Sequence, residues 1–395
     1  MGERAWLSII GIGEDGLEGL SGASRAALAA AEIVFGGARH LGLAQVGARG
    51  REWGLPFSVE AVLALRGRKV AVLASGDPFW FGVGGTLAAH LKPEEWRVFP
   101  GISTFSLAAA RLGWRLEEVV CLGLHAAPLD QLRPVVGRGQ RCICLLRDGA
   151  AVGELAAWLV SNGFGTTRVT VMEALGGGRE KCWEFVADGF DYRAVSALVC
   201  VAFEGVGRGM SRAAGLADEM FDHDGQITKR AVRALTLSAL APRAGEVLWD
   251  VGAGSGSVSI EFLLAAPGSV AHGIEADATR ARRARGNAGR FGLAHRYLVT
   301  EGRAPGALAG LPVPDVVFVG GGATGEVLAA VWAAMPEGGR LVVNAVTLET
   351  EALLVEWQGL KGGALLRIEL AEALPLGSRR GWQALRPVVQ WSVVK

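Results

Sequence analysis

The segment from 247 to 262, VLWDVGAGSGSVSIEF, constrains the fold more than any other stretch of the chain. It opens with an apolar run typical of a buried strand, which ends at Asp250. Glycines follow at three alternate positions, 252, 254 and 256, and an apolar helical pattern begins at Val258. Because glycine lacks a Cβ, such a turn tolerates positive φ angles and the close approach of a ligand. Strand, glycine turn and helix start together predict the first crossover of a doubly wound α/β domain.

The residues around this turn favour a cationic nucleoside over a dinucleotide. A dinucleotide site uses the spacing G-x-G-x-x-G and rests a pyrophosphate on the helix N-terminus. Here the spacing is G-x-G-x-G, and a carboxylate at Asp250 would repel a pyrophosphate. A second predicted strand, Val270–Ile274, ends in Glu275, which is placed to accept from two ribose hydroxyls. S-adenosylmethionine has an ammonium group and no phosphate, so it suits these acids; a nicotinamide site and a turn without ligand are the alternatives.

Length and charge predict a two-domain protein without a membrane segment. A chain of 395 residues exceeds one ordinary core. A formal net charge of +1 gives no global field that attracts nucleic acid or an anionic membrane. No apolar stretch approaches the roughly 20 residues that a bilayer requires, and the opening apolar run is too short for a signal peptide. We therefore expect a cytoplasmic protein that binds neither nucleic acid nor membrane.

The cysteines predict buried thiols and no metal site. There are five, all within the first 200 residues. Cys142 and Cys144 share one face of a predicted strand, RCICLL. No second cysteine pair or histidine follows at the spacing of a metal site, so packing is the favoured role.

The first half alternates strands with helices, and its strands end in loops of small residues. These loops are GIGEDG at 11–16, SGDPFWFG at 75–82 and PGIST at 100–104. Loops at the carboxyl edge of an open α/β sheet bind ligands, although each motif alone is an ordinary turn. In this order, GIGEDG, SGDPFWFG and PGISTFSLAAARLGW resemble the tetrapyrrole methylases, which are class III methyltransferases. The resemblance covers about residues 5–205.

This resemblance implies two α/β lobes around a cleft that holds S-adenosylmethionine and faces a large macrocycle. Carried over to this sequence, the cofactor residues are Gly76, Asp77, Ser103 and Thr104. The loop 11–16 would lie at the mouth of the cleft, with Glu14-Asp15 where the wider family usually has a proline. The aromatic residues Phe79, Trp80 and Phe81 are candidates for stacking on a macrocycle, or for packing in the core or between lobes.

The second half follows a stretch rich in small residues and arginine, EGVGRGMSRAAGLA at 204–217, which predicts a domain boundary near 205–215. Its predicted strands fit a seven-stranded sheet with an antiparallel last strand. The last two, Leu365–Ala371 and Val388–Val394, are expected to form an edge hairpin. The motifs FDHDGQITKR, VLWDVGAGSGSVSIE, VFVGGG, GGRLVVNAVTLET and ALPLG resemble the decarboxylating precorrin methyltransferases of cobalamin synthesis, which are class I enzymes.

Together the two resemblances imply a bifunctional enzyme with one S-adenosylmethionine site per domain. Residues 1–208 would form a tetrapyrrole methylase domain that methylates C5. Residues 209–395 would form a Rossmann-like class I domain that methylates C15 and decarboxylates the C12 acetate. The implied partner is an anionic reduced precorrin-6 macrocycle, converted to precorrin-8, and both families imply a homo-oligomer.

The class I resemblance places the second cofactor on residues from several loops. These residues, with the strand-end acids, are Thr228, Asp250, Gly252, Ala253, Gly254, Ser255, Gly256, Glu275, Arg303 and Ala304. An aspartate is common in the family at the Arg303 position, so a contact through the backbone N–H is expected there.

Methyl transfer to an electron-rich carbon needs positioning and no protein nucleophile. Cations suited to the substrate carboxylates are Lys229, Arg230, Arg233, Arg379, Arg380 and, in the first domain, Arg147. His223 is a candidate proton carrier because neighbouring acids hold a histidine charged, and Asn344 is a candidate substrate contact at a strand end. The predicted catalytic residues are therefore His223, Lys229 and Asn344, with no metal. The alternatives are an NAD-dependent oxidoreductase and a non-catalytic tetrapyrrole-binding protein.

Overall fold

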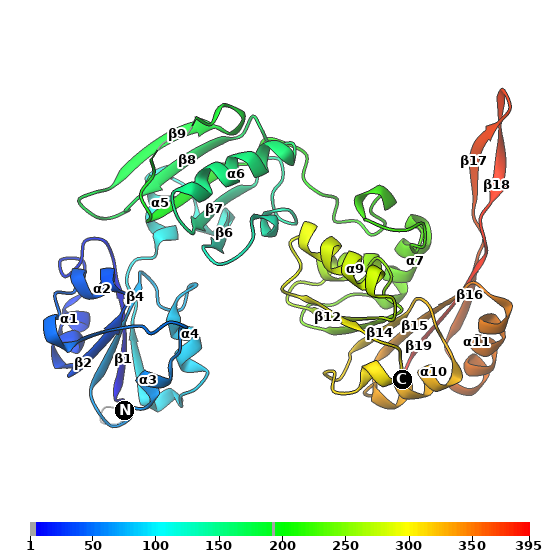
Figure 1. Ribbon diagram of the computed structural model, residues 1–395, viewed down its shortest axis with the longest axis horizontal. Coiled ribbons are helices and arrows are strands. Elements are labelled where there is room, and N and C mark those ends of the chain that lie inside the picture. The colour runs from blue at the N-terminus through cyan, green and yellow to red at the C-terminus, as the bar shows by residue number, and fades with distance from the viewer. Residues whose placement is uncertain (1–4, 192–193) are drawn as a thin grey trace. The chain divides into compact units, whose positions relative to one another are not determined.

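The computed structural model describes residues 5–191 and 194–395, which form two compact units (Figure 1). The first unit comprises the chain up to Leu129 together with Val135–Gly209, and the second comprises Asp130–Pro134 and Met210–Lys395. Both units combine β-sheets with helices, so the predicted α/β class is confirmed. Within the described residues, no helix has the length and apolar character needed to cross a bilayer.

The first lobe of the first unit is built on a parallel sheet in the order β3-β2-β4-β1-β5. The strands are β1 (Leu7–Ile12), β2 (Ile33–Gly36), β3 (Gly50–Glu52), β4 (Val70–Ser75) and β5 (Trp96–Phe99). The helices are α1 (Gly22–Ala30), α2 (Ala38–Leu43), α3 (Glu60–Leu63) and α4 (Val83–Ala88). Residues of β1 enter separate apolar clusters, so both faces of this sheet are covered. The loops after β1, β4 and β5 therefore share one edge.

The second lobe has a mixed sheet in the order β6-β7-β10-β8-β9, in which only β6 and β7 are parallel. The strands are β6 (Val119–Leu124), β7 (Arg141–Leu146), β8 (Arg168–Glu173), β9 (Lys181–Val186) and β10 (Val199–Glu204); the helices are α5 (Thr104–Leu112) and α6 (Ala150–Ser161). Cys142, Cys144 and Cys200 are buried as predicted, but Cys182 on the edge strand β9 is exposed. The described chain holds no cluster of three potential metal ligands.

The second unit has a seven-stranded sheet in the order β13-β12-β11-β14-β15-β19-β16, with β19 antiparallel to both neighbours. Its strands are β11 (Val247–Val251), β12 (Val270–Glu275), β13 (Tyr297–Glu301), β14 (Val316–Val319), β15 (Arg340–Ala345), β16 (Ala364–Ile368) and β19 (Val388–Val394). Its helices are α7 (Arg230–Leu240), α8 (Ser257–Ala265), α9 (Ala278–Arg290), α10 (Gly325–Ala334) and α11 (Leu348–Lys361). The predicted sheet is confirmed, and its order reverses between β11 and β14, where open α/β sheets bind ligands.

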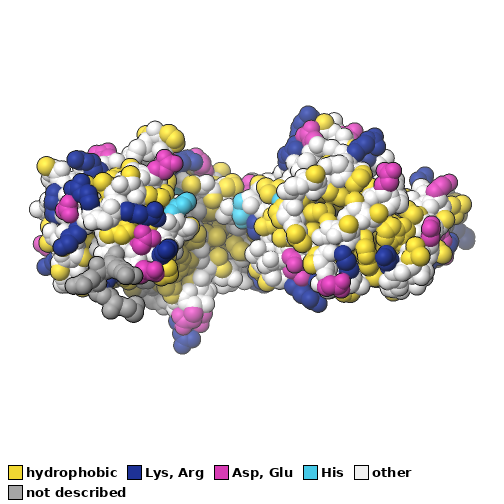
Figure 2. Space-filling model, turned by 90° about the horizontal axis from the view of Figure 1, so that it is seen from below, with side chains coloured by type: hydrophobic (Ala, Val, Ile, Leu, Met, Phe, Trp, Pro, Cys, Tyr) yellow, Lys and Arg dark blue, Asp and Glu magenta, His cyan; other side chains and the backbone are white. Residues whose placement is uncertain are grey.

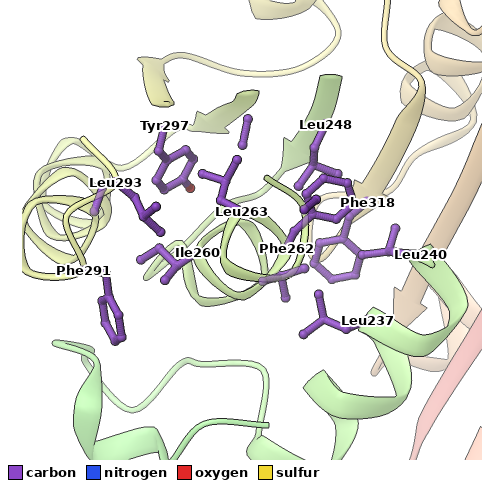
Figure 3. Packing of buried hydrophobic residues seen from close by; sticks show 14 of the residues in the cluster. Leu237, Leu240, Leu248, Ile260, Phe262, Leu263, Phe291, Leu293, Tyr297 and Phe318 are labelled. Carbon is purple, nitrogen blue, oxygen red and sulfur yellow. The ribbon is translucent and has the colours of Figure 1, made fainter. Parts of the chain in front are cut away.

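Helix α8 is held by one face of this sheet and by its neighbouring helices. Phe262 and Leu263 of α8 belong to the same core as Leu237 and Leu240 of α7 and Phe318 of β14 (Figure 3). Every residue from Ser257 to Leu263 is buried. This burial fixes the start of α8, and with it the glycine turn that precedes the helix.

A second hairpin interrupts the connection between β16 and β19 (Figure 1). Its strands, β17 (Ala371–Leu376) and β18 (Arg379–Ala384), extend away from the sheet of the second unit as a two-stranded ribbon. Every residue of both strands except Gly381 is exposed, including Leu376 at 71% and Trp382 at 80%. The described chain adds no third strand to it.

The surface carries both signs of charge. On the face shown in Figure 2, basic and acidic side chains are interspersed with hydrophobic ones. This mixture agrees with the formal net charge of +1. Any site that binds an anionic ligand must therefore use locally placed cations.

Candidate active sites

Three loops of the first lobe meet at Gly11, Gly76 and Gly101. The Gly101 N–H donates to the Gly76 carbonyl over 3.0 Å, and the Gly76 N–H donates to the Ile12 carbonyl over 3.1 Å. A Cβ on Gly11 would lie 1.8 Å from the Gly76 oxygen, and Gly76 has a φ of +53°. The close approach of these backbones requires glycine and gathers the three loops at one edge of the sheet.

A cavity of about 420 Å³ opens beside these loops and is lined by residues of both lobes. The Ser103 Oγ caps α5 by accepting from the Ser106 N–H over 3.0 Å, and Asp77 Oδ1 accepts from the Phe79 N–H over 2.9 Å. These side chains thus shape the loops that they belong to. The cavity brings together the four cofactor residues predicted for this domain: Gly76, Asp77, Ser103 and Thr104.

Aromatic side chains also line this cavity. Of the three stacking candidates, Trp80 and Phe81 line it, and so does Trp53, which was not predicted. Phe79 does not line the cavity; its ring packs on Trp96 with 5.4 Å between ring centroids. Phe81 has a φ of +56°, which costs a side chain about 1–2 kcal/mol. Its ring lies against Gly123, where a Cβ would come within 2.8 Å, and it remains 51% exposed. The fold thus holds an apolar ring at the cavity despite an unfavourable backbone.

Charged and histidine side chains also line the cavity, and some of them were not predicted. Arg147, a predicted substrate cation, lines it, and Glu14 of the first loop does so as well. Arg39, His40 and His125, together with Asp77 named above, complete this set. Nothing in the local sequence marks Arg39 or His40, because they meet the other residues only through the strand order of the first lobe.

In the second unit, the glycine turn adopts the backbone that its sequence predicts. Gly252, Gly254 and Gly256 all have positive φ angles, between +56° and +74°. A Cβ on Gly252 would lie 2.6 Å from the Gly321 oxygen, and one on Gly256 would lie 2.6 Å from the Tyr297 ring. At Gly254 the nearest atoms are two carbonyl oxygens 4.0 Å away. Two glycines therefore permit packing of the turn, and Gly254 leaves room for a ligand.

Glu275 lies beside this open glycine. Its Oε2 accepts from the Gly254 N–H over 2.8 Å, and its Oε1 accepts from the Asp277 N–H over 2.9 Å. The residue is 7% exposed. The structure thus joins the second predicted acid to the glycine turn, and each of its oxygens can still accept from a ligand hydroxyl.

A segment before α7 borders the turn. The fully buried Asn287 of α9 donates to the carbonyls of Asp222 and Ser255 and accepts from the Asp222 N–H. Asn287 therefore fastens Asp222 to Ser255 of the glycine turn. The Gln226 carbonyl is one of the two atoms nearest to the open side of Gly254. Predicted Thr228 follows Gln226 by two residues and is half-buried. Arg303 is exposed and Ala304 is half-buried after β13.

Asp250 corrects the expected electrostatics. The residue is 1% exposed, its Oδ2 accepts from the Ser259 Oγ of α8 over 2.6 Å, and its Oδ1 is buried without a partner among the described residues. Burial, reinforced by the charge of Glu275, raises the pKa of Asp250 from 3.8 to about 7. The side chain thus faces α8 beneath the turn, so attraction of a ligand ammonium to an open carboxylate is not what the structure shows.

We expect Asp250→Asn to remove a pH dependence from the stability of the second domain. The raised pKa means that the folded domain keeps a proton which the unfolded chain releases, so wild-type stability falls as pH rises from about 4 to about 7. The stability of the variant relative to wild type should therefore rise by on the order of a few kcal/mol between about pH 4 and pH 7. Urea unfolding followed by tryptophan fluorescence measures this difference. A difference that is constant with pH would contradict the assignment.

His223 lacks the acidic partners that motivated its selection. Asp224 Oδ2 accepts from Arg280 over 2.9 Å and pairs with Arg283 at 3.2 Å, while Asp222 lies 3.7 Å from Arg283. His223 Nδ1 instead accepts from the Gly225 N–H over 2.9 Å. With Nδ1 occupied as an acceptor, Nε2 is the ring nitrogen left for exchange of a proton. The acids on which the expectation depended pair with Arg280 and Arg283 and not with His223, which corrects that expectation.

Two other side chains that were predicted to contact the substrate bind partners inside the protein instead. Asn344 is 8% exposed; its Nδ2 donates to Thr236 over 3.0 Å, and its Oδ1 accepts from Gln390 over 2.9 Å. Arg233 is fully buried and donates to Glu261 over 2.6 Å and Asp218 over 3.0 Å. Neither side chain is directed to the open edge, which corrects the expectation of substrate contact for both.

The remaining predicted cations of the second unit are exposed. Lys229 lies at the start of α7, next to the segment that borders the glycine turn. Arg230 donates to the Gly215 carbonyl over 2.7 Å. Arg379 and Arg380 lie on β18 of the protruding hairpin.

Comparison with known proteins identifies both halves. The family described as Tetrapyrrole (Corrin/Porphyrin) Methylases matches residues 7–189, and the Precorrin methyltransferase domain matches residues 219–395. The precorrin-6Y C(5,15)-methyltransferase (decarboxylating) of Sinorhizobium sp is 49% identical, over 99% of this chain and 96% of that protein. The protein of the same name from Mycobacterium tuberculosis is 38% identical, over 98% of this chain and 99% of that protein.

A solved structure is also similar. The C-terminal domain of precorrin-6Y C5,15-methyltransferase from Rhodobacter capsulatus has 49% identity, covering 47% of this chain and 100% of that chain with a TM-score of 0.46. The full-length relatives are enzymes, so the oxidoreductase and the non-catalytic binding protein are set aside. The chain belongs to the precorrin-6Y C(5,15)-methyltransferase (decarboxylating) family.

Proposed function

We propose that this chain uses S-adenosylmethionine to methylate a reduced precorrin-6 macrocycle at C5 and C15 and decarboxylates its C12 acetate arm, giving precorrin-8 for cobalamin synthesis. The observation that supports this most strongly is 49% identity, over 99% of the chain, to a protein whose name states both methylated positions and the decarboxylation. We assign C5 methylation to residues 1–208, and C15 methylation with decarboxylation to residues 209–395. The two family matches, one in each half, support this division.

Each domain would hold one S-adenosylmethionine, which supplies an electrophilic methyl group. In the first domain the cofactor would contact the cavity lining at Gly76, Asp77, Ser103 and Thr104. In the second it would lie against Gly254, with Glu275 accepting from the ribose hydroxyls. The residues that complete the second site are Thr228, Gly252, Ala253, Ser255, Gly256, Arg303 and Ala304. The open side of Gly254 and the remaining acceptor capacity of the Glu275 oxygens fit such a ligand.

The chain's own residues would position the substrate and handle protons. At each methylated carbon the macrocycle supplies the electron pair of the new bond and then loses a proton. In the decarboxylation the bond to the carboxyl carbon breaks, its electrons enter the protonated macrocycle, and a proton completes the methyl group left on the arm. Exposed Lys229 would pair with a substrate carboxylate, and His223 would exchange a proton through Nε2. Asn344 would act only indirectly, by holding Thr236 of α7.

Titration calorimetry tests the cofactor assignment. We expect two S-adenosylmethionine molecules per chain and no heat from NAD. Binding of one molecule per chain would overturn the assignment of a site to each domain, and binding of NAD alone would overturn the function.

We also propose that the chain is a homo-oligomer and that a second copy covers the β17–β18 hairpin. An isolated two-stranded hairpin is marginally stable in water. Large apolar side chains at Leu374, Leu376 and Trp382 are exposed on this one. A copy of the same chain supplies matching strands and apolar side chains.

We expect the double variant Leu376→Ser, Trp382→Ser to lower the oligomeric mass without changing either cofactor site. Removing two large apolar side chains from an interface costs several kcal/mol, which is about a hundredfold or more in association. Sedimentation measures the mass, and Leu360→Ser on α11, also an exposed leucine (69%), is the control. An unchanged mass for the double variant would contradict the role of the hairpin.

A further inference from the structure

The cavity of the first domain contains an ionic cluster that has no part in the proposed cofactor site. Arg39 forms an ion pair with Glu14 of the first loop. Its Nη2 also donates to Ser75 Oγ over 2.7 Å and lies 2.7 Å from His40 Nε2. The Arg39 side chain is 30% exposed, and Arg39, Glu14, His40 and Ser75 all line the cavity. The guanidinium is therefore fixed by several neighbours and still accessible.

This cluster has an excess of positive charge. The Glu14 carboxylate is shared between Arg39 and Arg179, which lies 3.4 Å away on the loop after β8. Burial, with the charge of Arg39, lowers the pKa of His40 to about 4, so that ring is neutral near pH 7. Two guanidiniums thus share one carboxylate. By contrast, Arg147 is paired with two carboxylates of its own, Asp148 at 2.9 Å and Glu154 at 2.8 Å.

The proposed function supplies the anion that would complete this cluster. We propose that Arg39 binds a carboxylate arm of the macrocycle in place of Glu14, and so selects which carbon of the macrocycle faces the cofactor loop. Glu14 keeps Arg179 as its partner when Arg39 is taken. The number of ion pairs is the same before and after this exchange. The guanidinium of Arg39 is therefore already positioned without substrate, and it keeps its geometry when substrate binds.

The position of Arg39 is what gives it control over the site of methylation. Its guanidinium is bonded to Ser75, the last residue of β4, which immediately precedes Gly76 of the proposed cofactor loop. A carboxylate on Arg39 therefore belongs to an arm close to the reacting carbon. Apolar walls at Trp53 and Phe81 in the same cavity suit the faces of the macrocycle. Two contacts of different chemistry would then fix both the plane of the macrocycle and its rotation in that plane.

The test uses the full chain, reduced precorrin-6 and methyl-labelled S-adenosylmethionine, with nuclear magnetic resonance to assign each new methyl. For Arg39→Gln we expect kcat/KM for C5 methylation to fall about tenfold to a hundredfold, mainly through KM, because charged hydrogen bonds to the arm are lost. C15 methylation in the same chain serves as an internal control and should not change. Affinity for S-adenosylmethionine should also be unchanged, since Arg39 is not assigned to the cofactor.

For Glu14→Gln we expect KM for C5 methylation to fall and not to rise. A variant that fails to fold would not show a lower KM. Removing the competing carboxylate should lower KM for C5 methylation about threefold to tenfold, as expected when a modest ion pair no longer competes. The matched controls are Arg68→Gln and Glu32→Gln, an ion pair of the same lobe with N–O distance 2.8 Å that does not line the cavity. Neither control should alter KM for C5.

The outcomes separate this inference from the function on which it rests. If wild type transfers no methyl to the macrocycle, the function and the inference are both overturned. If wild type methylates both carbons but KM for C5 is unchanged in Arg39→Gln, or is raised in Glu14→Gln, the inference alone is overturned. Methylation of a different meso carbon by Arg39→Gln would support it most directly.

Discussion

Replacing Gly11 by alanine is expected to abolish C5 methylation while the same chain continues to methylate C15. The new Cβ would lie 1.8 Å from the Gly76 oxygen and 2.4 Å from the Gly101 nitrogen. Both are backbone atoms, so no rotation of a side chain relieves the clash, and the three loops must separate. Displacement of a catalytic loop by about 1 Å costs on the order of a hundredfold in rate, and here we expect at least that loss.

The measurement is the position of the labelled methyls in the product, together with cofactor stoichiometry. Calorimetry should show one S-adenosylmethionine per chain for Gly11→Ala, where we expect two for wild type. Gly22→Ala, at the start of α1 with no atom within 4 Å of its Cβ position, is the control and should keep both sites. If Gly11→Ala methylates C5 at the wild-type rate, the three loops do not form the first cofactor site.

Replacing Glu275 by glutamine is expected to weaken cofactor binding in the second domain about a hundredfold. The carboxylate oxygens accept from Gly254 and Asp277, and an amide replaces one acceptor with a donor that faces an N–H. The proposed bonds to the ribose hydroxyls weaken as well. Hydrogen bonds to charged groups are worth about 1.5–3 kcal/mol, so two such losses account for the effect. C15 methylation and decarboxylation should fall together, because both are assigned to this domain.

A close control for this variant is Glu301→Gln. Glu301 is the register partner of Glu275 on the adjacent strand β13, but it is exposed and paired with Arg285 over 2.7 Å. It should leave the affinity of both domains unchanged. If both variants lose cofactor affinity equally, a general change at this edge of the sheet is responsible, and not the contact made by Glu275.

The local parts of the fold and of the second site were predictable from sequence. A strand, a glycine turn and a helix start lie within sixteen consecutive residues, 247–262, and the positive φ angles at Gly252, Gly254 and Gly256 agree with that pattern. Glu275 was predictable for the same reason, since it ends the next strand. Asp250 was misjudged because its position in the pattern does not say on which side of the turn its carboxylate lies.

Other errors concern polar residues whose partners are distant in sequence. Arg233 was expected to bind a substrate carboxylate. It shares the spacing of Leu237 and Leu240 on the buried face of α7, and this signal could have placed it inside. Asn344 finds its partners 108 and 46 residues away, at Thr236 and Gln390. The cluster around Arg39 likewise forms only when parallel pairing brings β1, β2 and β4 together. Such contacts depend on topology, which hydrophobic periodicity alone does not specify.

Mass spectrometry of the product tests the proposed function most directly. The full chain is incubated with the reduced precorrin-6 macrocycle and S-adenosylmethionine labelled in the transferred methyl. We predict a product that has gained two labelled methyls and lost one carboxyl group as carbon dioxide. A product with no labelled methyl, or one that retains every carboxyl group, would contradict the assignment of two methylations and a decarboxylation to this chain.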